Sequence, residues 1–206
     1  MAVPVLDLST NRILTRRLAL RPLRAGDDAR LFELFANWNV ARFLSSPPWP
    51  YSREDAHAFV QLRTPPEQTD SITCAITHDG ALIGCIDVIN KPASNVQRDD
   101  GYNLGYWLGE PFWGAGFMSE AARAFVAHFF ATKSTDVLYS GAFSENAASL
   151  RIQEKLGFRR DGESLFYSRP RDGEFPHVST ILTRAAFERL ATRMPLPDRH
   201  DTGRRG

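Results

Sequence analysis

Residues 106–131 read YWLGEPFWGAGFMSEAARAFVAHFFA, and this stretch decides the fold. Its first residues end an apolar and aromatic run that begins at Tyr102, which is typical of a strand. Gly114 and Gly116 then open directly into a segment with apolar residues at every fourth position, which predicts a buried helix. A glycine turn at a helix start presents unpaired N–H groups at the positive end of the helix dipole. The stretch therefore predicts a site for a phosphate or pyrophosphate group.

Two other phosphate-binding motifs do not fit this stretch. Ser119 stands where a dinucleotide-binding GxGxxG motif has its third glycine, and no GK[ST] of a P-loop follows. A pair of glycines also occurs in tight turns that bind nothing. The glycine turn alone therefore leaves open an unrelated α/β protein with no affinity for a phosphate ligand.

Short strands and helices alternate along the rest of the chain. We expect strands at residues 16–23, 71–77, 81–89, 102–108 and 136–142, another that starts at 158–160, and a last hairpin that pairs 165–168 with 178–182. We expect helices at about 27–38, 52–62, 117–131, 146–156 and 184–193. In the strand at 16–23, alternation predicts that Leu18 and Leu20 point inward, while Arg17 and Arg21 lie on a solvated face.

Composition excludes several classes of protein. The 206 residues include 25 Lys and Arg against 24 Asp and Glu, so a net charge of +1 gives no reason to expect nucleic acid or an anionic membrane as partner. Cys74 and Cys85 lie in apolar runs, which indicates buried, reduced thiols. No secretion signal or membrane-spanning stretch is present, so we expect a cytoplasmic protein. One domain at residues 1–193 and a disordered tail at 194–206 are the simplest division.

Three motifs carry a resemblance to a known family. Residues 113–121 (WGAGFMSEA) resemble the acetyl-CoA signature of the GNAT acyl-CoA N-acyltransferases. Residues 146–149 (NAAS), followed by EKLGF at 154–158, resemble a helix of its RimJ/RimL branch, the ribosomal-protein-alanine N-acetyltransferase type. The opening TRRLALRPL at 15–23 matches as well. The resemblance covers roughly residues 12–190, with the motifs in the family's order.

The resemblance implies an α/β (α+β) fold. Its centre is a mixed, mostly antiparallel sheet of about seven strands, with helices on both faces. The sheet splays between its fourth strand, at 102–108, and its fifth, at 136–142. The pantetheine arm of acetyl-CoA enters the wedge between these two strands and pairs with the fourth strand as a pseudo-strand.

The resemblance also implies which residues hold the cosubstrate. They are Trp107, Leu108, Gly114, Ala115, Gly116, Phe117, Met118, Ser119, Asn146 and Ser149. A backbone N–H near Leu108 would polarise the thioester carbonyl, and Asn146 would secure the arm from the opposite strand's end. The thioester is already activated, so neither a metal nor a covalent intermediate is needed.

The base that takes the proton from the amine is less clear. The family's usual tyrosine acid is replaced by Gln153, and its usual strand glutamate by Asn103. The candidate bases are His177, Asp87, Asp100 and Glu110. We expect His177 because the family places this late strand along the acceptor cleft and because imidazole titrates near neutral pH. A structural or solvated histidine is the alternative.

The function implied is acetyl transfer from acetyl-CoA to a primary amine by direct attack in a ternary complex. The acceptor is either a protein N-terminal amine or a small-molecule amine. Phe43, Trp49 and Tyr51 fall where the family walls its acceptor site, with core packing as the alternative reading. A non-catalytic acyl-CoA-binding module is the other functional interpretation. A homodimer is possible.

Overall fold

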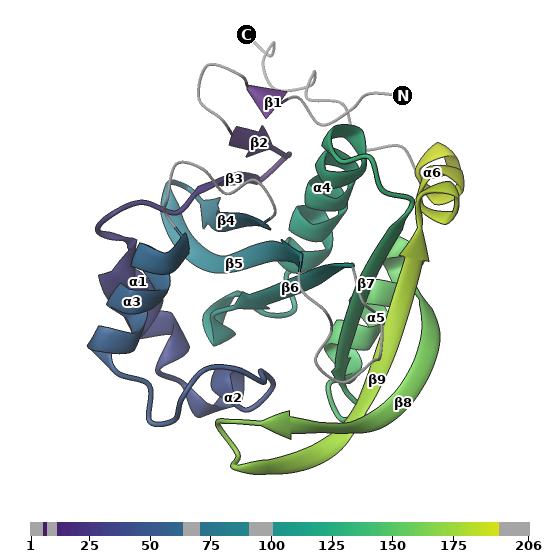
Figure 1. Ribbon diagram of the computed structural model, residues 1–206. Coiled ribbons are helices and arrows are strands. Elements are labelled where there is room, and N and C mark those ends of the chain that lie inside the picture. The colour runs from purple at the N-terminus through teal and green to yellow at the C-terminus, as the bar shows by residue number, and fades with distance from the viewer. Residues whose placement is uncertain (1–5, 8–11, 64–70, 91–100, 194–206) are drawn as a thin grey trace, which may run out of the picture.

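The computed structural model describes residues 6–7, 12–63, 71–90 and 101–193. Within these residues, nine strands form one sheet in the order β1-β2-β3-β4-β5-β6-β7-β9-β8 (Figure 1). The strands are β1 (Leu6–Asp7), β2 (Arg12–Leu14), β3 (Leu18–Pro22), β4 (Ser71–His78), β5 (Ala81–Asn90), β6 (Tyr102–Leu108), β7 (Val137–Phe143), β8 (Arg159–Ser168) and β9 (Gly173–Thr183). The helices are α1 (Asp27–Phe35), α2 (Trp38–Ala41), α3 (Arg53–Arg63), the 3-10 helix η1 (Glu110–Phe112), α4 (Phe117–Thr132), α5 (Ala147–Leu156) and α6 (Arg184–Arg193).

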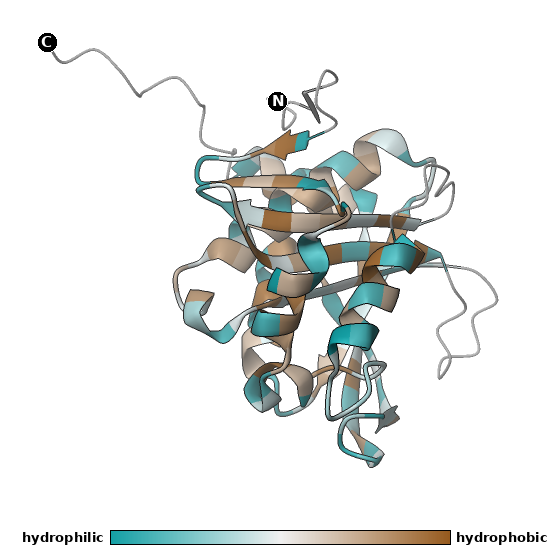
Figure 2. Ribbon diagram, turned by 90° about the vertical axis from the view of Figure 1, so that its left-hand side faces the viewer, coloured by the Kyte–Doolittle hydropathy of each residue, from teal (hydrophilic) through white to brown (hydrophobic). Residues whose placement is uncertain are grey.

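Two hydrophobic cores lie on opposite faces of the sheet. The first joins α4 to the sheet, with Phe125 and Phe129 fully buried. The second joins α1 and α3 to the other face, with Leu31 and Val60 among its members. Figure 2 shows hydrophilic and hydrophobic stretches on the helices, as expected of helices that cover a core with one side. Helices therefore flank both faces, as expected, and none in the described part of the chain is long and apolar enough to cross a membrane.

The hairpin of β4 and β5 forms as its sequence predicts. Asp79 and Gly80 both have positive φ, 48° and 81°, which is the conformation that a two-residue turn of this kind needs. Cys74 and Cys85 are buried free thiols in the two strands, as their apolar surroundings indicate. Burial raises the pKa of Cys74 to about 12. Both cysteines thus act as small core residues.

The sheet departs from the expected one at both ends. β1 and β2 precede the predicted first strand, and their lengths of two and three residues are too short to give a readable alternation. At the other edge, Leu165–Ser168 pairs with Gly173–Pro176 and not with residues 178–182, which corrects the predicted hairpin. β8 is one strand from Arg159 to Ser168. Its first half is polar because it forms a solvated edge, which hid it from a search for apolar alternation.

Arg21 corrects a second expectation. It does not lie on a solvated face, since only 7% of the residue is exposed. Its guanidinium donates two hydrogen bonds of 2.7 Å to Asp27, which is itself 5% exposed. Asp27 also accepts a bond from the backbone N–H of Arg24 at 2.9 Å. This ion pair fixes the start of α1 against β3.

Replacing Asp27 by asparagine should therefore destabilise the fold. The change would leave the buried Arg21 charge without its counter-ion, and breaking such a pair costs about 3 kcal/mol. A urea unfolding curve measures the loss as a lower midpoint. Asp28→Asn is the matched control, since Asp28 is the next residue and its carboxylate contacts only the exposed His57 and the N–H of Ala29 among the described residues. Equal midpoints for the two variants would contradict the assigned role.

The splay of the sheet is present at the predicted place. β6 and β7 are parallel neighbours, yet only one residue pair, Asn103 with Tyr139, is in register between them. Figure 1 shows the two strands diverging from this point. All other neighbouring strands pair antiparallel. The sheet is thus mixed and mostly antiparallel, with nine strands instead of about seven.

Candidate active site

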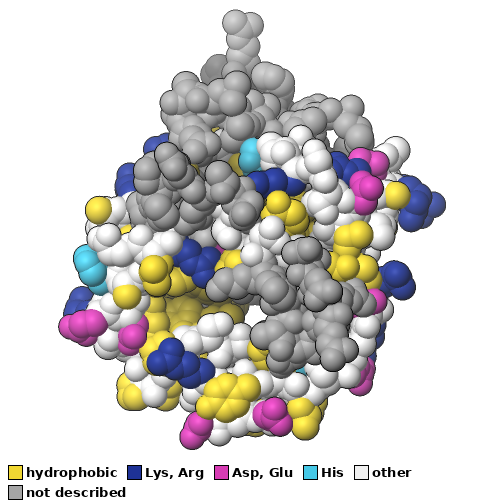
Figure 3. Space-filling model, viewed as in Figure 1, with side chains coloured by type: hydrophobic (Ala, Val, Ile, Leu, Met, Phe, Trp, Pro, Cys, Tyr) yellow, Lys and Arg dark blue, Asp and Glu magenta, His cyan; other side chains and the backbone are white. Residues whose placement is uncertain are grey.

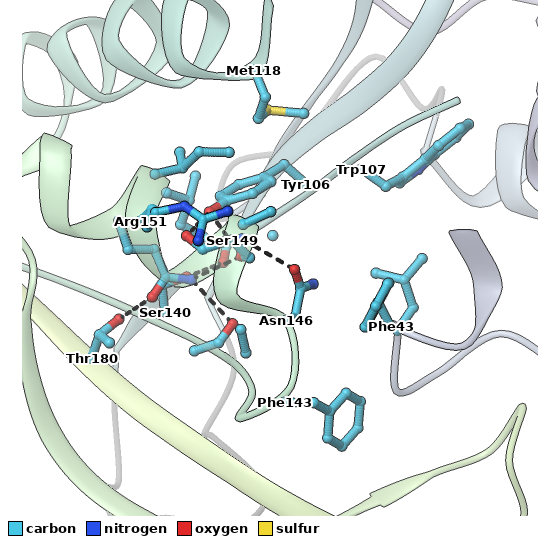
Figure 4. A pocket seen from close by; sticks show the side chains of 18 of the residues that line it. Phe43, Tyr106, Trp107, Met118, Ser140, Phe143, Asn146, Ser149, Arg151 and Thr180 are labelled. Atoms are coloured by element: carbon cyan, nitrogen blue, oxygen red, sulfur yellow. Dashed lines mark hydrogen bonds between the residues drawn. The ribbon is translucent and has the colours of Figure 1, made fainter. Parts of the chain in front are cut away.

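A cavity of about 730 Å³ occupies the gap between β6 and β7. The glycine turn before α4 lines one end, the first turns of α5 line the middle, and β8 and β9 line the other end. Figure 4 shows Tyr106, Asn146 and Ser149 together in its middle, with Phe43 and Phe143 beyond them. The cavity therefore joins the predicted phosphate site to the predicted acceptor site.

The glycine turn has the conformation that its sequence predicts. Gly114 and Gly116 have φ values of 75° and 77°, and Gly116 is the N-cap of α4 with no side-chain cap. The first N–H groups of a helix have no partner within the helix. Residues that follow Gly116, from Phe117 to Ser119, line the cavity. Backbone N–H groups thus face the place where a pyrophosphate is expected.

Arg17, in the link between β2 and β3, holds this turn in place. The sequence did not reveal this role. The Arg17 guanidinium donates a hydrogen bond of 2.9 Å to the Ala115 carbonyl and one of 2.7 Å to the Glu120 carboxylate. It also lies over the Phe117 ring, 4.5 Å from the ring centroid. Glu120 also accepts 2.7 Å from the Thr15 hydroxyl. Burial alone would raise the pKa of Glu120, but the bonds from Thr15 and Arg17 lower it. The charged pair therefore holds the turn in place.

The backbone of β6 points toward the wedge at the predicted position. The N–H of Gly109 donates 2.9 Å to Ile83 of β5, so its neighbour Leu108 directs its own N–H and carbonyl away from β5. The Leu108 carbonyl accepts 2.8 Å from the Trp113 indole. The Leu108 N–H is therefore directed at the gap, as its predicted role requires.

The start of α5 gathers polar groups on the opposite wall. Asn146 caps the helix, because its side-chain oxygen accepts 3.1 Å from the N–H of Ser149. The Tyr106 hydroxyl, from β6, lies 3.0 Å from the Ser149 hydroxyl and 3.2 Å from its carbonyl. Burial raises the pKa of Tyr106. Tyr106 is a site residue that the sequence analysis did not include, since its partner is 43 residues away.

Gln153 has a structural task. It is 1% exposed, and its amide donates to the Gly141 carbonyl at 3.2 Å and to Ser149 at 3.3 Å. Its oxygen accepts 2.7 Å from Thr180. The side chain thus ties α5 to β7 and β9.

His177 lies at the far end of the cavity. On β9 it faces Phe143 of β7 and Ser164 of β8, and its ring stacks on Phe166 with centroids 4.8 Å apart. The imidazole covers Gly141, where an added Cβ would come within 2.3 Å of its Cε1. Burial lowers the pKa of His177. The imidazole is therefore neutral at pH 7 and able to accept a proton.

The other candidate bases lie elsewhere. Glu110 accepts hydrogen bonds from Asn37 and Asn39, at 2.6 and 2.9 Å, and does not line the cavity. Asp87 pairs with Arg63 at 3.0 Å; burial raises its pKa to about 6, and it does not line the cavity either. Asp100 lies outside the described residues. His177 is therefore the one of the three described candidates that the cavity contains.

Most of the predicted cosubstrate residues meet in this cavity. It is lined by Trp107, Leu108, Gly114, Gly116, Phe117, Met118, Ser119, Asn146 and Ser149. Ala115 is not in the lining, and its carbonyl is taken by Arg17. Across the described stretches, no cluster of three or more His, Cys, Asp or Glu residues is arranged to hold a metal ion.

The aromatic residues before α3 divide between surface and core. Phe43 lines the cavity. Trp49 packs on Trp38 with ring centroids 5.1 Å apart, and both are exposed. Tyr51 is 8% exposed and lies 4.5 Å from the ring of Phe35 in the second core. Of the three, only Phe43 is placed to touch a ligand in the cavity.

Comparisons with known proteins agree with this geometry. A family model described as an acetyltransferase (GNAT) domain matches residues 17–159. The uncharacterised N-acetyltransferase YnaD of Bacillus subtilis (strain 168) is 25% identical over 150 residues, which are 73% of this chain and 84% of that protein. Mycobacterium smegmatis RimJ in complex with CoA-disulfide shares the fold, with a TM-score of 0.72 at 17% identity over 87% of this chain and 90% of that one.

A second solved structure also shares the fold. It is the microcin C7 self-immunity acetyltransferase MccE in complex with acetyl-CoA and AMP, with a TM-score of 0.69 at 15% identity over 81% of this chain and 92% of that one. The family model itself spans well over half of the chain. The protein is therefore an acyltransferase enzyme that belongs to the GNAT acetyltransferase family.

Proposed function

We propose that the protein transfers the acetyl group of acetyl-CoA to a primary amine by direct attack in a ternary complex. The observation that carries this proposal is the continuous cavity from the glycine turn, through the wedge between β6 and β7, to His177. Such a shape accommodates a long cosubstrate at one end and a second reactant at the other. Solved neighbours of the same fold hold acetyl-CoA or a CoA derivative, which supports the choice of cosubstrate.

In this proposal the backbone holds acetyl-CoA. The N–H groups from Gly116 to Ser119 bind the pyrophosphate, and the ion pair of Arg17 with Glu120 holds the turn that presents them. The pantetheine arm pairs with the wedge side of β6 through the Leu108 N–H, while the main-chain groups of Trp107 face β5 and Trp107 only lines the cavity. The side-chain N–H groups of Asn146 are left for the arm, since its oxygen caps α5. The backbone N–H groups of this turn thus bind one anion, although the chain's net charge is only +1.

The chemistry then needs few groups. The amine nitrogen attacks the thioester carbon, and the Leu108 N–H stabilises the oxygen that becomes negative, a contact worth about 3 kcal/mol. His177 takes the proton that the nitrogen loses. The C–S bond breaks and the CoA thiolate takes up a proton. The hydroxyls of Tyr106, on β6, and Ser149, on α5, deliver that proton and are reprotonated from solvent, to which His177 releases the proton that it took. Cytoplasmic location and a homodimer stay predictions.

Acetyl-CoA should stabilise the protein against heat. A ligand at 100 times its dissociation constant adds about 2.7 kcal/mol to the free energy of unfolding. A thermal melt with and without acetyl-CoA measures the shift, and release of CoA with a panel of amines then tests turnover. Adenosine alone is the control, because it lacks the pyrophosphate and the arm. An unchanged melting temperature at millimolar acetyl-CoA would refute the proposal.

A further inference from the structure

Glu110 has a carboxylate that the proposed chemistry does not use, and both of its oxygens are engaged. The residue begins η1 and does not line the cavity. Its Oε2 accepts a hydrogen bond of 2.6 Å from the Asn37 amide, and its Oε1 accepts one of 2.9 Å from the Asn39 amide. Asn37 is also the N-cap of α2, since its side-chain oxygen accepts 2.9 Å from the N–H of Asn39. One carboxylate therefore holds the start of α2.

The main chain that carries Glu110 is itself fixed. The Gly109 N–H donates 2.9 Å to the Ile83 carbonyl of β5. A Cβ added at Gly109 would come within 2.7 Å of Leu34 on α1, so the end of β6 lies directly against that helix. Leu108, whose N–H polarises the thioester in the proposed reaction, stands two residues before Glu110. The main chain at Glu110 is therefore fixed relative to the proposed place of the thioester.

The segment that Glu110 holds, residues 37–45, forms one wall of the cavity, and we call it the wall segment. The members that line the cavity are Val40, Phe43, Leu44 and Ser45. The end of the wall segment is held by the turn between β8 and β9. There the Ser168 hydroxyl donates 3.2 Å to the Leu44 carbonyl. The N–H of Arg169 donates 2.9 Å to the Ser45 carbonyl. The wall segment is thus tied at both ends.

The wall segment joins the two parts of the splayed sheet. Its start is tied to the end of β6, and its end is tied to the β8–β9 turn, on the other side of the splay. Figure 1 shows α2 between these two places. In the same view the surface is hollowed, and hydrophobic side chains gather in the hollow (Figure 3). A reactant that binds against the wall segment therefore has its position set from both sides of the gap.

We infer that Glu110 is a positioning residue: by holding α2 against the end of β6, it sets the distance between an amine bound at the wall segment and the thioester carbon. This inference rests on the proposed acetyl transfer. Glu110 touches neither reactant and acts through Asn37 and Asn39. A misplacement of about 1 Å between reacting groups can cost about 100-fold in rate, so a small shift of the wall segment is enough.

Helix α2 needs such a tie because it is short. Its four residues, Trp38–Ala41, form barely one turn, and so short a helix gains little stability from its own backbone bonds. Val40 and Ala41 are buried in the second core and keep the helix on the body of the protein. Hydrogen bonds to a carboxylate are shorter and stronger than those between neutral groups. The two bonds to Glu110 therefore fix how α2 is oriented toward β6, while the core keeps it folded.

The test measures kcat/KM for an amine on the full chain at saturating acetyl-CoA, with release of CoA as the signal. The probes are n-butylamine, 2-phenylethylamine, spermidine and a tetrapeptide that begins with alanine, and the fastest wild-type acceptor among them is used. Glu110→Ala should lower kcat/KM roughly 10- to 100-fold, with the acetyl-CoA dissociation constant unchanged. Glu33→Ala is the matched control and should match the wild type, because Glu33 pairs with Arg30 on α1 at 2.8 Å and does not line the cavity.

Asn39→Ala separates positioning from a purely structural role. Asn39 is exposed, and within the described residues its amide donates only to Glu110. This variant should show a smaller fall in kcat/KM than Glu110→Ala, at the wild-type melting temperature. The double variant should be no slower than Glu110→Ala, because both changes remove the same contact.

Two results would overturn the inference. One is a Glu110→Ala enzyme that matches Glu33→Ala in kcat/KM and loses only melting temperature or acetyl-CoA affinity. The other is a double variant whose loss is the product of the two single losses, since the residues would then act independently. A wild-type protein that does not bind acetyl-CoA, or releases no CoA with any of the four amines, would instead refute the proposed function.

Discussion

Gly116→Val should abolish measurable acetyl-CoA binding. Gly116 has a φ of 77°, a conformation that a β-branched residue essentially never adopts, so the turn must change shape. An added side chain would also approach the Arg17 guanidinium, which is 3.6 Å from the Cβ position. The N–H groups that follow would then no longer converge on the pyrophosphate. We expect affinity to fall at least 100-fold, or about 2.7 kcal/mol, as measured by calorimetric titration.

A matched variant separates this effect from backbone strain. Gly80 in the β4–β5 turn has a φ of 81°, and nothing lies within 4 Å of an added Cβ. Gly80→Val therefore imposes the same kind of strain in a turn that does not line the cavity. It should lower the melting temperature about as much as Gly116→Val but leave acetyl-CoA affinity intact. Wild-type affinity in Gly116→Val would show that the turn does not hold the pyrophosphate.

His177→Ala should lower kcat by roughly 10²- to 10⁴-fold, the range for a lost general base. Because burial lowers the pKa of His177, the wild-type enzyme should keep its activity at pH 7 and lose it only as the pH falls through that lowered pKa. The sign follows from the role: the neutral imidazole is the active form. In the variant this acid limb of the pH profile should disappear. Rates of CoA release between pH 4.5 and 8 measure both effects.

His128→Asn is the control for that profile. Burial lowers the pKa of His128 as well, but this residue is on α4 and does not line the cavity. Its replacement should leave both kcat and the acid limb unchanged. A His177→Ala enzyme with the wild-type profile would remove His177 as the base and return the search to other groups.

Local pattern predicted most of the fold. The alternation in β4 to β6, the turn at Gly80 and the motif at Gly114 each depend on residues close in sequence. The splay was placed correctly by the family resemblance and not by local pattern. Arg21 was misplaced because alternation assigns a face without knowing that Asp27 would neutralise a charge there. The extent of β8 was misread because its exposed, polar residues show no apolar alternation.

The site residues that belong to a continuous sequence motif could be predicted. Those that depend on contacts between residues far apart in the sequence could not. The turn at Gly114 and the cap at Asn146 belong to continuous motifs, so their lining of the cavity followed. Arg17 meets Glu120 across 103 residues, and no local pattern announces such a pair. Tyr106 likewise meets Ser149 across 43 residues, and only the fold shows that contact.

Because β6 and β7 diverge, acetyl-CoA bound as proposed would lie between two parts of the sheet. With a single residue pair in register, the nine strands behave as a six-stranded and a three-stranded sheet joined along a seam. Few main-chain bonds cross that seam. Helix α4 connects the two parts along the chain, and it packs against α5, which follows β7. A pantetheine arm that pairs with β6 would fill the gap between the two parts. Each catalytic cycle would thus add and remove contacts between the two parts of the sheet.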